Sequence, residues 1–267
     1  MKKLILILLI GLFSIANTKN ELIKINTHKV INNFIQTNIL KINVKELDYI
    51  LKNPAEFKNS FLKYLTKKRN FENYNEWPLD KFFYILGVTQ DTTYFDYLLK
   101  FLDHANFLNN NCNLNCGLIF ALIMTSNDKK IKNLMLLKNQ NPFITDIIDG
   151  YKKLKNKKKK TILERKKELN KSLQFYEKDK SILFKNIQSK NIIEVIAIAD
   201  NSHKTYLERL MAIKVVEYLG ESEELIPYLL DILINKSIKD DSGEFIYSCQ
   251  NALIKIIKRI RLNKVRK

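Results

Sequence analysis

Two features of the sequence predict an all-α fold. Glycine and proline, which all-β proteins need in their frequent turns, occur only six and four times in 267 residues. Apolar residues recur instead at intervals of three and four, as on one face of a helix, for example at Val30 and Phe34 and at Leu47 and Leu51. Hydrophobic residues make up 46% of the chain, which is enough for a sizeable core and argues against a disordered protein.

The first sixteen residues have the order of a secretory signal peptide. Lys2-Lys3 precedes an apolar run from Leu4 to Phe13, and Ser14-Ile15-Ala16 supplies small residues where a signal peptidase would read them. The run is too short to cross a bilayer comfortably as a helix. We therefore expect residues 1–16 to be a signal peptide and the protein to be exported, to the periplasm or the cell surface. An uncleaved anchor or an ordinary buried helix is the alternative.

Prolines mark the starts of the next helices. Pro54 and Pro78 each suit the first turn of a helix, and the stretch from Arg69 to Trp77 between them is predicted to be a loop. Asn141-Pro142 ends the helix before it, because the residue preceding a proline is displaced from helical geometry. A further helix is expected to begin at Phe143.

A unit of three helices occurs twice in the sequence. In the first copy a helix ends at Leu86-Gly87, a second contains Tyr97-Leu98-Leu99, and a third opens at Cys116. The second copy has its Leu-Gly pair 133 residues later and its Tyr-Leu-Leu triplet 131 residues later. Repeated units of this kind predict helices that stack on one another to bury a shared core.

Small residues in these units predict how the helices end and cross. Gly87 and Gly220 are expected to end the first helix of each copy in the left-handed conformation that glycine adopts freely. Four other small residues are expected at close helix crossings, where they let backbones approach: Gly117, Ala121, Ala212 and Ala252.

The second copy resembles the HEAT-repeat family of α-solenoids. Residues 209–220 form a helix that ends in Leu-Gly, a short acidic turn follows, and residues 224–230 place Pro227 where the family often has a proline. The first copy departs from this pattern, with Asp96 at that place and a longer turn. The resemblance covers about residues 78–125 and 205–261 and implies a protein-binding solenoid of α-hairpins, with no catalytic residues to transfer. Generic helical hairpins remain the alternative.

The positive charge of the chain is concentrated in two segments. The net charge is +18, of which Lys2 and Lys3 contribute two. Residues 152–171 hold eleven Lys or Arg against two Glu, and residues 255–267 hold seven with no acidic residue. Clustered charge predicts an anionic partner. The alternative is a solvated, lysine-rich surface that reflects only the coding bias of an AT-rich genome.

A heptad pattern in the first basic segment predicts a long helix. Ile162, Leu169, Tyr176 and Leu183 recur every seven residues, although Lys166 and Lys180 interrupt the stripe. We therefore expect one long amphipathic helix with a basic outer face, between two helical lobes. The predicted organisation is a signal peptide at 1–16, an N-terminal lobe at 17–140, a basic helical connector at 141–200, and C-terminal HEAT-like hairpins with a basic tail at 201–267.

No residue pattern predicts catalysis, a metal site or a cofactor. His28, His104 and His203 are scattered, and the chain has no glycine-rich phosphate loop. The acidic stretch from Asp240 to Glu244 lacks the alternating ligands of a calcium loop. The odd number of cysteines argues against a disulfide framework, and the spacing of Cys112 and Cys116 is a weak metal signal, so Cys112, Cys116 and Cys249 are expected to be small buried residues.

The predicted function is therefore non-catalytic binding of a protein partner by an exported helical scaffold. The alternative is attachment to an anionic membrane surface or envelope polymer; nucleic acid is not expected as the partner of an exported protein. In either case the predicted contact residues are the basic ones of the two segments: Lys157, Lys158, Lys159, Lys160, Arg165, Lys166, Lys167, Arg259 and Arg261.

Overall fold

The computed structural model describes residues 2–37, 39–66, 76–104, 116–137, 141–156, 160–173, 191–236 and 243–264, with side chains from Thr18 onward except at some helix ends. Every regular element in these ranges is a helix. The prediction of an all-α fold is confirmed.

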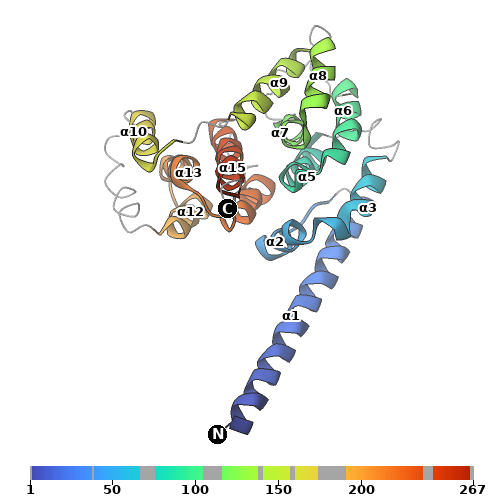
Figure 1. Cartoon of the computed structure of the whole chain (residues 1–267), viewed down its shortest axis with the longest axis vertical. Helices are drawn as coiled ribbons and strands as arrows, with labels where there is room; N and C mark the ends of the chain where they lie inside the picture. Colours follow the sequence, from blue (N-terminus) through green and yellow to red (C-terminus); the bar gives the residue numbers. More distant parts are fainter. Residues whose placement is uncertain are drawn as a thin grey trace.

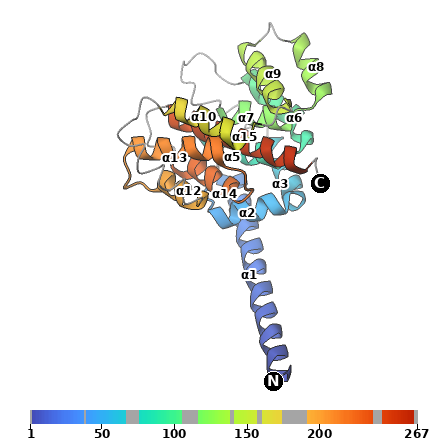
Figure 2. The same cartoon turned by 60° about the vertical axis from the view of Figure 1, so that its left-hand side comes forward.

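Helix α1 (Lys2–Thr37) extends from the body of the molecule as one long rod (Figure 1, Figure 2). Its second half joins the core, because Thr27, Ile31 and Phe34 lie on one face and are buried against α2 (Val44–Lys52) and α3 (Pro54–Leu65). Helix α3 begins at Pro54, as predicted. Within the residues whose side chains are described, no helix is long and apolar enough to span a membrane.

The first unit consists of α5 (Glu76–Thr89), α6 (Phe95–His104) and α7 (Cys116–Thr125), and α8 (Asp128–Leu136) and α9 (Pro142–Lys155) follow it. Helix α5 packs more extensively on α7 than on α6. The buried carboxylate of Asp80 on α5 accepts hydrogen bonds from the backbone N–H groups of Gly117 (2.7 Å) and Leu118 (3.1 Å), so that it caps the first turn of α7.

The second unit has the same order of elements. Helix α12 (Ile192–Asp200) precedes α13 (Tyr206–Leu219), α14 (Leu225–Asp231) with the π-helical turn η2 (Ile232–Lys236), and α15 (Gly243–Lys264). Here too the first helix, α13, packs mainly on the third, α15, and on α12. Thus the main pairing in both units joins first and third helices, whereas the repeat pattern predicted hairpins of first and second helices.

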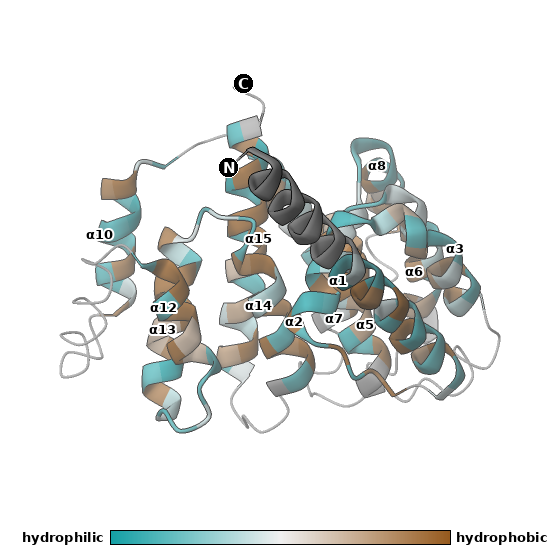
Figure 3. Ribbon diagram, turned by 90° about the horizontal axis from the view of Figure 1, so that it is seen from below, coloured by the Kyte–Doolittle hydropathy of each residue, from teal (hydrophilic) through white to brown (hydrophobic). Residues whose placement is uncertain are grey.

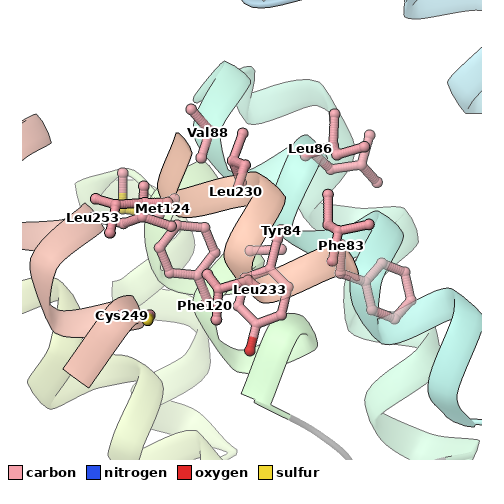
Figure 4. Packing of buried hydrophobic residues seen from close by; sticks show 14 of the residues in the cluster. Phe83, Tyr84, Leu86, Val88, Phe120, Met124, Leu230, Leu233, Cys249 and Leu253 are labelled. Atoms are coloured by element: carbon pink, nitrogen blue, oxygen red, sulfur yellow. The ribbon is translucent and has the colours of Figure 1, made fainter. Parts of the chain in front are cut away.

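The two units pack directly against each other. Figure 4 shows Phe83 and Tyr84 of α5 and Phe120 of α7 beside Leu233 of η2 and Cys249 of α15 in one continuous core. Packing runs from α10 (Ile162–Ser172) through α13 and α15 to η2, α5 and α7, so that these helices lie in a row (Figure 3). A buried hydrogen bond from Gln250 Nε2 to the Tyr84 hydroxyl joins the units.

The predicted role of Gly87 and Gly220 as left-handed residues is wrong. Gly87 lies inside α5, where a Cβ atom would come within 2.6 Å of Cε1 of Phe120. Gly220 follows α13 with φ −61° and ψ 133°, which is extended backbone. The left-handed residue after α5 is Gln90, with φ 57°. Gly87 is therefore explained by the close approach of α7. The four residues predicted to lie at close helix crossings are all buried: Gly117, Ala121, Ala212 and Ala252.

The predicted single long basic helix is also wrong. Helix α9 ends at Lys155, Asn156 leaves helical geometry with ψ 115°, and Thr161 and Glu164 form a capping box that starts α10. Helix α10 itself ends at Ser172. A continuous helix would have placed the lysines of residues 152–160 three and four residues apart along its faces, where like charges repel. Tyr176, Leu183 and Lys180 of the heptad pattern lie outside the described residues.

Candidate functional site

The two basic segments of the sequence meet at the C-terminal end of α13. Side chains of α10, α13 and α15, and of residues next to the first two helices, line an open cavity of about 130 Å³ there, which we call the α10–α15 cavity. Two carboxylates, those of Glu168 and Glu221, also line it. The cationic side chains that line it are Lys160, Arg165, Lys255, Lys258 and Arg259.

Arg165 occupies the buried face of α10. Its side chain is only 6% exposed, and it stands in line with Leu169 and Leu173, which are also buried against α13. One guanidinium nitrogen, Nη2, pairs with Glu221, and the other, Nη1, donates to the carbonyl of Tyr218 at 3.3 Å. The third nitrogen, Nε, is buried with no hydrogen-bond partner in the described part of the chain.

Arg259 and Lys258 approach the same region from α15. Arg259 donates to the carbonyls of Gly220 (2.5 Å) and Glu217 (2.6 Å), which are at the C-terminal end of α13, where the helix dipole favours a cation. Lys258 Nζ donates to the carbonyl of Lys153 in the last turn of α9 at 2.7 Å. Neither cation has a carboxylate in ion-pair range among the described residues.

The other cations of the cavity are paired. Lys255 Nζ lies 2.6 Å from Oε1 of the buried Glu217 and 4.0 Å from the centre of the Tyr218 ring. Lys160 forms an ion pair with Glu168. The cavity therefore holds more positive than negative charge, and the surplus belongs to Lys258 and Arg259.

This concentration of cations affects their proton affinity. Burial, followed by repulsion from Arg165, lowers the pKa of Arg259 to about 10, against the opposing attraction of Glu221, Glu217 and Glu168. Burial, followed by repulsion from Lys160 and Arg259, lowers the pKa of Lys258. The positive charges in the cavity are thus close enough to repel one another.

The exposed side chains of α10 form a second basic surface, which we call the α10 outer face. Lys166, Lys167 and Lys171 are exposed there. Two apolar side chains at the start of the helix, Ile162 and Leu163, are 57% and 65% exposed. The predicted basic outer side of this helix is therefore observed, but Ile162 is not part of the buried stripe that the heptad pattern predicted.

The nine predicted contact residues thus fall into separate places. Lys160, Arg165 and Arg259 come together in the α10–α15 cavity, and Lys166 and Lys167 lie on the α10 outer face. Arg261 stands apart and donates from Nε to the Gln90 side chain at 2.6 Å. The other three lie outside the described residues: Lys157, Lys158 and Lys159.

The sequence reasoning missed the partners that shape the cavity. Glu217 and Glu221 lie at the end of α13, and Lys255 and Lys258 belong to α15. Lys255, Lys258 and Arg259 are spaced by three and four residues, which places them on one face of a helix. That spacing could have predicted a basic face on α15. No local pattern in the sequence predicts that this face lies next to α10.

The described residues contain no group of three or more His, Cys, Asp or Glu arranged to hold a metal ion. Cys249 is completely buried, as expected; Cys112 lies outside the described residues, and the side chain of Cys116 is not described. Comparison of the chain with models of protein families, with curated proteins and with solved structures finds no match.

Proposed function

We propose that this protein is an exported, non-catalytic helical scaffold that binds an acidic protein partner through the α10 outer face. The observation that supports this proposal best is the orientation of α10. The buried side of the helix packs against α13. Lys166, Lys167 and Lys171 are exposed to solvent, together with Leu163. A cluster of lysines on one exposed surface is complementary to an acidic partner.

The proposed scaffold is a HEAT-like solenoid in the broad sense of helices stacked in a row. Two three-helix units with the same element order and a shared core support this architecture. The pairing of first with third helices in each unit differs from simple hairpins. The proposal therefore rests on the stacking of the units and on their repeated sequence.

An anionic membrane surface or envelope polymer is the second candidate partner. Ile162 and Leu163 favour a membrane in particular, because exposed apolar residues beside lysines are what an interfacial helix inserts among lipid headgroups. The apolar part is limited to these two residues at one end of α10, whereas an interfacial helix carries an apolar face along its length. We therefore rank a protein partner first.

The test compares two probes, poly-glutamate as an acidic polypeptide and vesicles of phosphatidylglycerol. The variant K166Q/K167Q removes two charges from the α10 outer face. The matched control K129Q/K132Q removes two exposed charges from α8. If the proposal holds, K166Q/K167Q binds poly-glutamate about tenfold more weakly than wild type, as expected for two surface charges, and the control binds normally.

The same probes separate the two candidates. Tight vesicle binding that is lost in the variant I162S/L163S, with weak binding of poly-glutamate, would favour the membrane. Equal weakening by K166Q/K167Q and K129Q/K132Q would show that net charge alone drives binding, and the proposal would be abandoned.

A further inference from the structure

We infer that the α10–α15 cavity is a binding site for a single phosphate group, either free phosphate or the terminal phosphomonoester of a larger molecule. This site is on the inner side of α10 and is separate from the α10 outer face. It therefore does not depend on the proposed protein partner.

The first argument is the charge that the cavity leaves without a counterion. Ion pairs with Glu168, Glu217 and Glu221 account for three of its five cations. Lys258 and Arg259 contact only backbone carbonyls in the described part of the chain. A bound dianion would supply the missing negative charge and relieve the repulsion among these cations.

The second argument is the fixed position of Arg165. Its side chain lines the cavity and is only 6% exposed. Nη2 pairs with Glu221, and Nη1 donates to the Tyr218 carbonyl. The guanidinium is therefore held beside the cavity before any ligand binds, so that little side-chain freedom is lost on binding.

The third argument is size and shape. The cavity of about 130 Å³ equals the liquid volume of roughly four water molecules, at about 30 Å³ each, which suits one tetrahedral oxyanion. The lining includes Lys160 and Arg165 from one segment and Lys258 and Arg259 from α15. Several donors around one group favour phosphate, with its four oxygens, over a planar carboxylate.

The edge of the cavity indicates where the rest of a larger ligand would lie. The side chains of Lys160 and Glu168 are 47% and 40% exposed. A phosphomonoester could therefore insert its phosphate while the group that it esterifies stays in solvent. A phosphodiester has no terminal phosphate to insert and is expected to bind more weakly.

The test measures the thermal unfolding midpoint and the binding heat of the full chain with inorganic phosphate, against chloride at equal ionic strength. K258Q removes a surplus cation of the cavity, and K167Q removes one exposed charge from the other side of α10. We expect phosphate to raise the midpoint of wild type and K167Q, and K258Q to lose at least about tenfold in affinity, the loss of one charge-assisted contact.

Two results would overturn the inference. One is a phosphate effect no larger than that of chloride, which would mean that the cavity does not bind phosphate. The other is an equal loss of phosphate affinity in K258Q and K167Q, which would mean that the net charge of the protein attracts phosphate without a specific site. The proposed function is tested separately, because K166Q/K167Q retains the cavity and K258Q retains the α10 outer face.

Vesicles distinguish the two sources of the phosphate group. Binding to vesicles with phosphatidic acid, but not to those with phosphatidylglycerol, and its competition by inorganic phosphate would identify a lipid headgroup as the ligand. Binding of inorganic phosphate without preference for phosphatidic acid would identify a free phosphate site. Both outcomes require the loss in K258Q.

Discussion

The first and second units share a helical frame but use different residues to hold it together. In register with the 133-residue offset, the buried Asp80 of α5 corresponds to the buried Ile213 of α13. At this position the first unit joins its first and third helices through a carboxylate and two backbone N–H groups, whereas the second unit has an apolar side chain in the core. The two units therefore differ in a polar contact that joins two of their helices.

The ends of the first helices differ even more. After α5, the chain turns at Gln90, whose side chain accepts one exposed hydrogen bond from Arg261. After α13, both Arg165 and Arg259 donate to the final carbonyls. Two arginines therefore contact the end of α13, where they line the α10–α15 cavity, whereas one arginine contacts the turn after α5.

The largest expected effect tests the carboxylate of the first unit. Asp80→Ala leaves the buried N–H groups of Gly117 and Leu118 without this acceptor, which should lower the free energy of unfolding by about 3 kcal/mol. Asp80→Asn keeps an oxygen and should be less destabilising than Asp80→Ala. At the apolar position of the second unit the order should reverse, with Ile213→Asn worse than Ile213→Ala.

Chemical denaturation of these four variants gives the answer. Identical rankings at positions 80 and 213 would contradict the difference that we draw between the two units.

The next prediction concerns Lys81, the buried neighbour of Asp80. Burial lowers the pKa of Lys81 to about 8, from 10.5. Between these values the unfolded chain binds more protons than the folded chain, so the contribution of Lys81 raises the free energy of unfolding as pH rises, by up to about 3 kcal/mol across the window.

Lys81→Met should remove this rise, which urea unfolding over the same pH window would detect. Lys214 occupies the corresponding place in the second unit, within 4.0 Å of Glu217 and 3.9 Å of Glu244. Lys214→Met should keep the rise, since Lys81 is still present. A flat wild-type profile would refute the prediction.

The smallest expected effect compares the two helix ends. Arg259→Met removes two hydrogen bonds to the end of α13 and should lower the free energy of unfolding by about 2 kcal/mol. Arg261→Met removes one exposed hydrogen bond to Gln90 and should lower it by about 0.5 kcal/mol. Equal decreases in the free energy of unfolding in the two variants would contradict the difference between the ends of α5 and α13.

Local signals in the sequence predicted what depends on neighbouring residues. The start of α3 at Pro54 follows from the geometry of one proline, and the all-α class follows from the scarcity of turn residues. The structural role of Gly87 could not be predicted, because a glycine that ends a helix and a glycine that lets another helix approach look the same in the sequence. Only the approach of Phe120 distinguishes them.

The cavity could be predicted only in part. The charge runs pointed to Lys160, Arg165 and Arg259 but implied that all of them faced solvent. Arg165 is instead buried, because Glu221 and the Tyr218 carbonyl neutralise and solvate it in place of water. That compensation comes from a helix more than fifty residues away, and no periodicity within α10 reveals it.

Helix α15 has a consequence for the order of folding. It follows every other described element in the chain, yet Gln250 bonds to Tyr84, Lys258 to Lys153 and Arg261 to Gln90, the last contact spanning 171 residues. During synthesis from the N-terminus, the earlier helices must wait for α15 with their shared apolar surface uncovered. A nascent chain stopped before residue 243 would therefore expose that surface and aggregate, however well its individual helices had formed.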